Sequence, residues 1–108
     1  MRPDAQLYFI PLSFQAPTKG KPTGLKAHRF SGMTINASPC RPESRGAIHI
    51  RSANPDDTPV IHRNYLATEN DMRVMIDSLR LADEVAHTGP LAGVVEERLF
   101  MPAGKLSD

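Results

Sequence analysis

Residues 39–55 constrain most strongly what this chain can fold into. Residues 42–46 read Pro-Glu-Ser-Arg-Gly, in which the proline fixes φ, the serine can bond the local backbone and the glycine tolerates positive φ. In residues 48–51, two isoleucines on one face alternate with His and Arg on the other, and Asn54-Pro55 is a second turn signal. The pattern predicts a hairpin whose second strand has one buried side. We expect earlier strands to pair with this hairpin and a later helix to cover the sheet.

Other extended segments lie on both sides of this stretch. Residues 6–11 carry apolar bulk on both faces, which predicts a central strand covered on both sides. In residues 29–38, the face with Met33 and Ile35 is expected to pack toward a helix, while the other face is polar and suits either a cavity wall or bulk water. The expected strands are residues 6–11, 29–38, 47–52 and 59–63.

One long helix is expected from about residue 69 to residue 87. Thr68 is a good N-cap, Asp71 favours the positive end of the helix dipole, and Gly89-Pro90 should stop the helix. The apolar positions cover well over half of the circumference, which is wider than the roughly 100° stripe of an ordinary surface helix. A small sheet covers one side only, so a second chain, a second domain or the C-terminal tail must cover the other. The positions expected in that contact are Val74, Leu81 and Val85.

The composition fits one small α+β domain over residues 1–108. Hydrophobic residues make up 40% of the chain, and the 10 prolines are about twice the usual share of roughly 5%, which indicates many turns. Because the apolar residues are patterned, disorder is not expected. The fold class is therefore a small antiparallel or mixed sheet with one long helix across one face.

The charge balance indicates no strongly charged partner. The net charge is +1, and the basic residues do not cluster with aromatic ones, so a nucleic-acid partner is not expected. Arg41, Arg45 and Arg51 suit either a phosphate patch or a solvated turn. No run reaches the roughly 18 apolar residues of a membrane span. The single cysteine, Cys40, excludes an internal disulfide and suits a reducing cytoplasm.

Common catalytic motifs are absent from the sequence. There is no G-x-G-x-x-G, no P-loop and no G-x-S-x-G. Ser44 is either a nucleophile or a turn serine, and no base is identified beside it. The histidines stand far apart, without an HxH or HxxxH pair, so no metal site is expected. They are His28, His49, His62 and His87.

Several of these motifs together resemble the C-terminal substrate domain of the glucose-methanol-choline (GMC) flavin oxidoreductases, and in particular their choline dehydrogenase-like branch. The first two are Pro-Glu-Ser-Arg-Gly at 42–46 and Arg-Ser-Ala-Asn-Pro-Asp-Asp at 51–57. Arg-Pro-Asp-Ala-Gln-Leu at 2–7, the segment 59–66 and the helix 70–85 follow the family's order. The resemblance covers nearly the whole chain and implies a fragment of a longer enzyme.

The resemblance implies FAD in the intact enzyme, with a histidine that takes the proton of a small alcohol substrate while hydride passes to the flavin. The family's catalytic histidine segment and flavin fingerprint do not occur in this chain. We therefore assign no catalytic, cofactor-binding or metal residue, and we expect the chain alone to bind no FAD and to be inactive. Its expected partner is the missing FAD-binding domain, or a second copy through the helix face.

The resemblance also places two aromatic residues near the substrate cavity. Tyr8 and Phe14 are candidate pocket residues that offer aromatic faces to a cation, and ordinary core packing is the alternative. Tyr8 stands where some choline-oxidising relatives have a histidine, so choline itself is not implied. Residues 13–27 suit either a gate over the pocket or a simple tether.

Two functions of different classes fit these features. The first is the wall of the alcohol pocket in an FAD-dependent alcohol or choline dehydrogenase-like oxidoreductase. The second is a non-catalytic binding or dimerisation module derived from the same fold. A stable dimer through the apolar helix face would favour the second.

Overall fold

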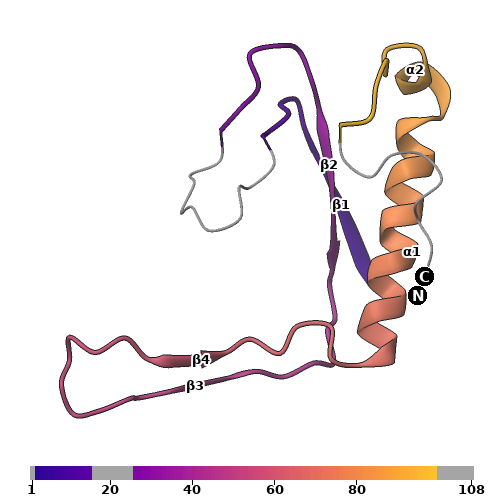
Figure 1. The fold of residues 1–108 in the computed structure, drawn as a ribbon. Helices are drawn as coiled ribbons and strands as arrows, with labels where there is room; N and C mark the ends of the chain where they lie inside the picture. Colours follow the sequence, from indigo (N-terminus) through magenta and orange to yellow (C-terminus); the bar gives the residue numbers. More distant parts are fainter. Residues whose placement is uncertain (1, 16–25, 100–108) are drawn as a thin grey trace.

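The computed structural model describes residues 2–15 and 26–99. These residues form two separate two-stranded antiparallel sheets and one long helix (Figure 1). The α+β class is confirmed, although the strands divide between two sheets where one sheet was expected. The elements are β1 (Ala5–Ile10), β2 (Thr34–Pro39), β3 (Ala47–His49), β4 (Val60–His62), α1 (Glu69–Ala86) and α2 (Gly89–Ala92).

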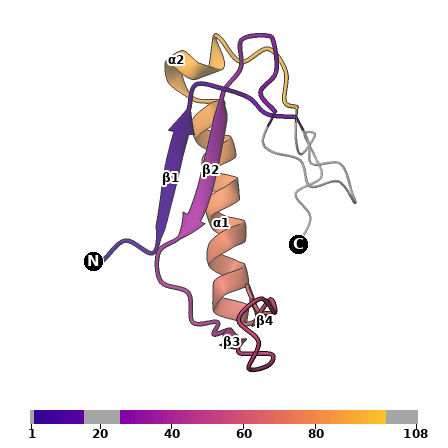
Figure 2. The ribbon, with the colours of Figure 1, turned by 90° about the vertical axis from the view of Figure 1, so that its left-hand side faces the viewer.

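The first sheet pairs β1 with β2 from Ala5 opposite Pro39 to Ile10 opposite Thr34. Helix α1 runs along this sheet and contacts both strands (Figure 2). Half-buried Leu7, Ile35 and Ala37 share one face of the sheet, and the exposed Tyr8 lies on the other face. The prediction that the face with Ile35 packs toward a helix agrees with this burial.

Two expectations for these strands were wrong. Strand β1 is not central, because β2 is its only neighbour among the described residues and both Tyr8 and Phe9 are exposed. Strand β2 begins at Thr34, five residues later than expected. The chain at 26–28 instead pairs with the segment just after β1, where the His28 amide donates to the Ser13 carbonyl at 2.9 Å. The dipeptide Ser31-Gly32 has low strand propensity, which explains the late start.

The turn at 39–46 does not pair β2 with β3, as the sequence suggested. It carries the chain from the first sheet to the N-terminus of α1, and β3 then pairs with β4, with Ile48 opposite Ile61. These strands have three residues each and are shorter than the expected 47–52 and 59–63. Pro59 cannot donate to a ladder, which limits the paired length on that strand. A turn near Asn54 closes the far end, in which the Asp57 amide donates to the Asn54 carbonyl.

The β3–β4 hairpin extends away from the rest of the molecule (Figure 1). Its alternation is as expected, but the isoleucine side is not buried. Ile48 is 70% exposed, Ile50 is 89% exposed and Ile61 is 55% exposed. The expectation of one buried side is therefore wrong within the described residues, because no other element lies against the hairpin.

Helix α1 begins and ends close to the expected positions. The Thr68 hydroxyl accepts from the Asp71 amide at 3.2 Å, which confirms the N-cap, and His87 is the C-cap. The turn Thr88-Gly89 both stops α1 and starts the short helix α2, with φ of 59° at Gly89. Pro90 fits the first turn of α2 because its missing N–H would have no partner there.

The core of the described residues is small. Ala82 is the only buried apolar side chain among them, and the other buried side chains are polar: Ser13, Asp71 and Ser78. No helix in the described part is long and apolar enough to cross a membrane. The expected gate or tether at 13–27 lies partly outside the described residues.

Candidate functional site

A buried carboxylate connects the turn at 42–46 to α1. Asp71 is 2% exposed and lies in the first turn of the helix. Its two carboxylate oxygens accept the backbone amides of Glu43 and Ser44, each at 2.8 Å, and the Ser44 hydroxyl donates to the same carboxylate. We call this set of contacts the Asp71 clasp. Bonds to a charged acceptor are about twice as strong as neutral ones, so the clasp joins two segments 27 residues apart firmly.

The clasp lowers the pKa of Asp71 below its usual value of 3.8. The hydroxyl of Ser44 is the largest cause, followed by the Glu43 amide, and both favour the charged form. Burial acts in the opposite direction but does not outweigh the bonds. Asp71 is therefore a structural anion at neutral pH and not a proton-transfer group.

The Ser44 hydroxyl also accepts the Ala67 amide at 2.9 Å, so it joins a third segment to the clasp. With its oxygen bonded on both sides, Ser44 is a structural turn serine. This geometry favours the turn interpretation over the nucleophile. No histidine contacts this hydroxyl among the described residues, and the carboxylate that accepts its proton, Asp71, has a lowered pKa and is therefore a weak base.

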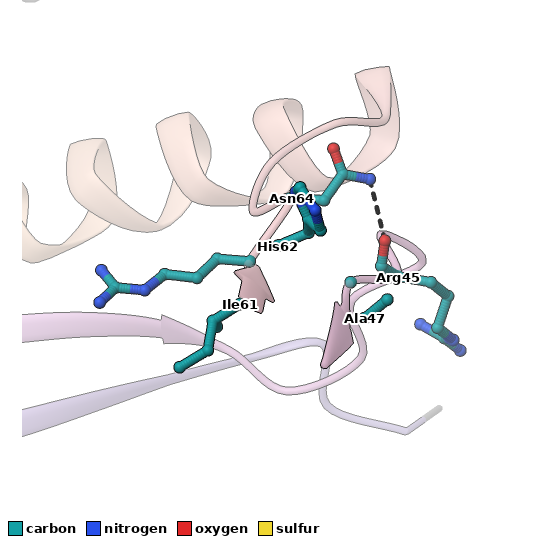
Figure 3. A pocket seen from close by; sticks show the side chains of 7 residues that line it. Arg45, Ala47, Ile61, His62 and Asn64 are labelled. Atoms are coloured by element: carbon teal, nitrogen blue, oxygen red, sulfur yellow. Dashed lines mark hydrogen bonds between the residues drawn. The ribbon is translucent and has the colours of Figure 1, made fainter. Parts of the chain in front are cut away.

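A close crossing of the two hairpin strands lies beside the clasp. The Asn64 side-chain amide donates to the Arg45 carbonyl at 2.9 Å, and Asn64 has φ of 49° (Figure 3). A Cβ added at Gly46 would overlap the His62 carbonyl oxygen and approach the Arg63 carbonyl oxygen to 2.6 Å. Glycine at position 46 is thus required by the space available and not by a positive φ, which Gly46 does not have.

An open groove of about 680 Å³ follows the base of the hairpin. The guanidinium of Arg45 donates to the carbonyls of Pro42 and Ser44 at 2.8 and 3.0 Å, so it braces its own turn. The lining contains no acidic side chain that could act together with its basic ones. Its lining residues are Arg45, Gly46, Ala47, Ile61, His62, Arg63 and Asn64.

A second cavity, of about 400 Å³, lies between the N-terminal half of α1 and the end of β2. It contains the Asp71 clasp at one end and Leu81 at the other, with both acidic and basic side chains between them. Mixed charge of this kind gives no preference for an anion or a cation. No group of three or more metal-ligating side chains occurs in the described part of the chain.

The two pocket candidates from the sequence lie in different places. Tyr8 is on the face of the first sheet opposite Leu7, Ile35 and Ala37, 45% exposed, and its hydroxyl donates to the Gln6 side chain at 3.0 Å. Phe14 is half-buried in the loop after β1, where it forms an isolated bridge with Ala27. The ring contacts found among the described residues join His28 to Phe30 and His49 to His62, and neither includes the two candidates.

Sequence reasoning missed the role of Asp71. It placed this residue in the first turn of the helix for its charge, and the structure adds the three bonds to Glu43 and Ser44. A signal was present, because a carboxylate three residues after an N-cap is well placed to face any turn that passes the helix N-terminus. The partner turn, however, lies 27 residues earlier and is not identified by local patterns.

Comparison with known proteins gives consistent results. Residues 42–107 match the family model for the C-terminal domain of GMC oxidoreductases. Dehydrogenase str4 of Strobilurus tenacellus is 38% identical over 90 residues, which are 83% of this chain and 14% of that protein. Glucose dehydrogenase [FAD, quinone] of Drosophila pseudoobscura pseudoobscura is 34% identical over 82% of this chain and 14% of its own length.

Oxygen-dependent choline dehydrogenase of Vibrio vulnificus is 37% identical over 83 residues, which are 77% of this chain and 14% of the relative. No solved structure matches the fold significantly. The chain thus spans about one seventh of the length of these relatives. Because the family model covers more than half of the chain and includes the turn, the hairpin and α1, the chain belongs to the C-terminal domain of the GMC oxidoreductase family.

Proposed function

We propose that this chain is a portion of the substrate domain of an FAD-dependent oxidoreductase that acts on CH–OH groups, and that it forms a wall of the alcohol pocket. The observation that carries the proposal is the uncovered polar face of the β1–β2 sheet. Helix α1 lies behind the sheet, and no described element covers the front (Figure 2). Gln6, Tyr8 and Asn36 are exposed on that face.

The side chains of this face suit a small alcohol. Tyr8 lies directly opposite Asn36, so an aromatic ring and an amide are neighbours across the two strands. An amide supplies a donor and an acceptor for a hydroxyl group, and an aromatic face attracts a cationic or apolar substituent. A wall that mixes polar and aromatic groups is typical of small-molecule sites.

The exposed area supports the need for a large partner. The accessible surface is 9209 Å², whereas a folded monomer of this mass exposes about 5,900 Å². The radius of gyration is 17.7 Å, against about 13 Å for a compact domain of this length. The excess area is of the size buried in large permanent interfaces, which bury upward of about 2,000 Å². We propose the FAD-binding part of the enzyme as the partner.

We also propose that the described residues do not form a site for FAD by themselves. A dinucleotide pyrophosphate is normally held by a glycine-rich turn at the start of a helix. Here the start of α1 carries Glu69 and the buried carboxylate of Asp71, which repel a phosphate group. We therefore assign no residue of this chain to the flavin and derive no reaction step from it.

A chimera tests the proposal. The matched segment of the Vibrio vulnificus choline dehydrogenase is replaced by this chain, and flavin content and choline oxidation are measured. We expect a flavin-containing protein that oxidises an alcohol. In that chimera, Tyr8→Ala should raise KM at least several-fold with flavin content unchanged, because an aromatic wall residue contacts substrate and not flavin.

Tyr65→Ala is the matched control, since Tyr65 lies after the hairpin and away from the sheet. It should leave KM unchanged. A chimera that folds but binds no flavin would contradict the place of this chain in the enzyme. If the chimera binds flavin but Tyr8→Ala leaves its KM unchanged, this chain belongs to the enzyme but Tyr8 does not line the alcohol pocket.

The alternative is a non-catalytic dimerisation module, and one observation favours it. Leu81 is 49% exposed and Val85 is exposed on α1, while Val74 is half-buried, so part of the face expected to meet a partner is open. Sedimentation of the 108-residue chain distinguishes the two. A stable dimer that Leu81→Lys converts to a monomer supports the module, and an aggregating monomer supports the enzyme portion.

A further inference from the structure

The β3–β4 hairpin brings together two histidines that are 13 positions apart. His49 lies opposite Val60, and His62 lies opposite Ala47, so the two histidines occupy diagonal positions on one face of the hairpin. Their ring centroids are 6.4 Å apart, with an angle of 64° between the ring planes. Both residues are exposed, and the isoleucines of β3 and β4 lie on the opposite face.

The other two histidines of the chain are engaged. The Nδ1 atom of His28 is 3.0 Å from the Ser13 hydroxyl, and its ring stacks on Phe30 at 4.6 Å. The Nδ1 atom of His87 is 2.8 Å from the Asp83 carbonyl, and the Asp83 carboxylate is close to the same ring. In the described part of the chain, the ring nitrogens of His49 and His62 have no hydrogen-bond partner. Their lone pairs are thus available to a ligand.

The separation suits a shared metal ion. An imidazole nitrogen lies 2.0–2.1 Å from zinc, so its ring centroid lies roughly 3.2 Å from the ion. Two rings on one ion therefore have centroids at most roughly 6.4 Å apart, and roughly 5.2 Å apart at a tetrahedral angle. The observed 6.4 Å is at the upper limit. Rotation of two exposed side chains supplies the remaining approach of about 1 Å, because such rotamers interchange freely.

From this geometry we infer that His49 and His62 form a two-imidazole chelate for a divalent transition-metal ion such as Cu²⁺, Ni²⁺ or Zn²⁺. Water completes the coordination. The pair is flanked in sequence by three positively charged residues, Arg45, Arg51 and Arg63. Charge attraction therefore does not hold the cation, and the nitrogen lone pairs must bind it. Imidazole prefers these ions, whereas Mg²⁺ and Ca²⁺ require oxygen ligands. The inference does not depend on the proposed enzyme function.

Calorimetric titration of the 108-residue chain tests the chelate. The chain carries Cys40→Ser, because Cys40 is an exposed thiol that binds the same ions. We expect one Ni²⁺ per chain, tighter binding of Cu²⁺, weaker binding of Zn²⁺, and none of Mg²⁺. His49→Ala and His62→Ala should each weaken Ni²⁺ at least ten-fold. The matched controls His28→Ala and His87→Ala should leave it unchanged.

A second measurement needs no substitution at the site. Paramagnetic Ni²⁺ should selectively broaden the ring proton signals of His49 and His62 in the NMR spectrum, while those of His28 and His87 stay sharp. Broadening of all four rings alike, or binding that survives His49→Ala, would overturn the chelate. So would the absence of one-to-one Ni²⁺ binding in a chain whose hairpin is folded.

Discussion

The two ends of the turn-and-hairpin segment differ sharply in how they are held. At its base, the Asp71 clasp satisfies two backbone amides and a hydroxyl with one buried carboxylate, and Gly46 lies against the opposite strand without space for a side chain. Further along, Ile48 and Ile50 are 70% and 89% exposed, and no described element outside the hairpin lies against it. The polar base is held by bonds within this chain, and the described residues do not cover the apolar arm.

This contrast teaches where the stability of the segment comes from. In most domains apolar burial fixes the position of a hairpin, and polar bonds refine it. Here a charged acceptor holds the base of the arm, and the apolar face is exposed. Under the proposed function, the clasp presents the hairpin to the rest of the enzyme in a defined orientation.

The largest effect is expected from Asp71→Asn, which removes the charge and places an amide group against three donors. The hairpin base should lose its order, because a buried donor left without an acceptor costs the full desolvation of that group. Hydrogen exchange should show that the Glu43 and Ser44 amides lose their protection. Asp77→Asn on the exposed side of α1 is the matched control. Retained protection in Asp71→Asn would show that the clasp does not order the base.

The same clasp predicts a pH dependence. The pKa of Asp71 is lower in the folded chain than its usual 3.8, so the clasp stabilises the fold at all pH values above about 4. This contribution is lost as the pH falls through the lowered folded value. As the pH is lowered, the Ser44 amide should keep its exchange protection to a lower pH than it would if Asp71 had its usual pKa. Loss of protection already above pH 4 would contradict a lowered pKa of Asp71.

Gly46→Ala should have the next largest effect. Its Cβ overlaps the His62 carbonyl, so the strands must separate at their base, and forced overpacking costs about 1–3 kcal/mol. Gly93→Ala is the control, because its Cβ would meet only the Pro90 carbonyl at 3.6 Å. Urea unfolding of both variants measures the difference. Equal stability of the two would mean that the strands at Gly46 are not closely held.

Removal of the N-cap should have a smaller effect. Thr68→Ala loses the bond to the Asp71 amide but leaves the carboxylate in place, and N-cap losses cost about 1 kcal/mol. Thr68→Ser keeps the oxygen and should restore most of the stability. If Thr68→Ser were as destabilising as Thr68→Ala, packing of the methyl group and not the cap would explain the loss.

The arm itself should show the smallest effect in the isolated chain. Ile48→Ser alters a side chain that is 70% exposed, so the unfolding free energy should change by no more than about 0.5 kcal/mol. In the chimera with the Vibrio vulnificus enzyme, the same substitution should reduce the yield of flavin-containing protein. A large destabilisation of the isolated chain would mean that this chain already covers the isoleucine face.

Local patterns predicted the helix well, because Thr68, the apolar periodicity and Gly89 act within a few residues of one another. The family was also recognisable from short motifs in order. The pairing of the strands could not be predicted in the same way. The turn at 42–46 is compatible both with a β3 that pairs with β2 and with a chain that continues to the start of α1. Asp71 decides between these paths, and its bonds reach 27 residues back along the chain.

The candidate pocket residues show the same limit. Tyr8 was placed on a strand, and the open face on which it lies depends on which side α1 covers. The exposure of the isoleucines was not visible either, because alternation indicates that one side seeks burial and does not identify the covering surface. The nearness of His49 and His62 likewise required the register of β3 and β4.

The most direct test of the central claim compares bound flavin in two purified proteins: the 108-residue chain alone, and the chimera that carries it in place of the matched segment of the Vibrio vulnificus enzyme. Visible absorbance measures flavin per chain in each. We expect about one flavin per chain in the chimera and none in the isolated chain. Stoichiometric flavin in the isolated chain, or none in a folded chimera, would contradict this expectation.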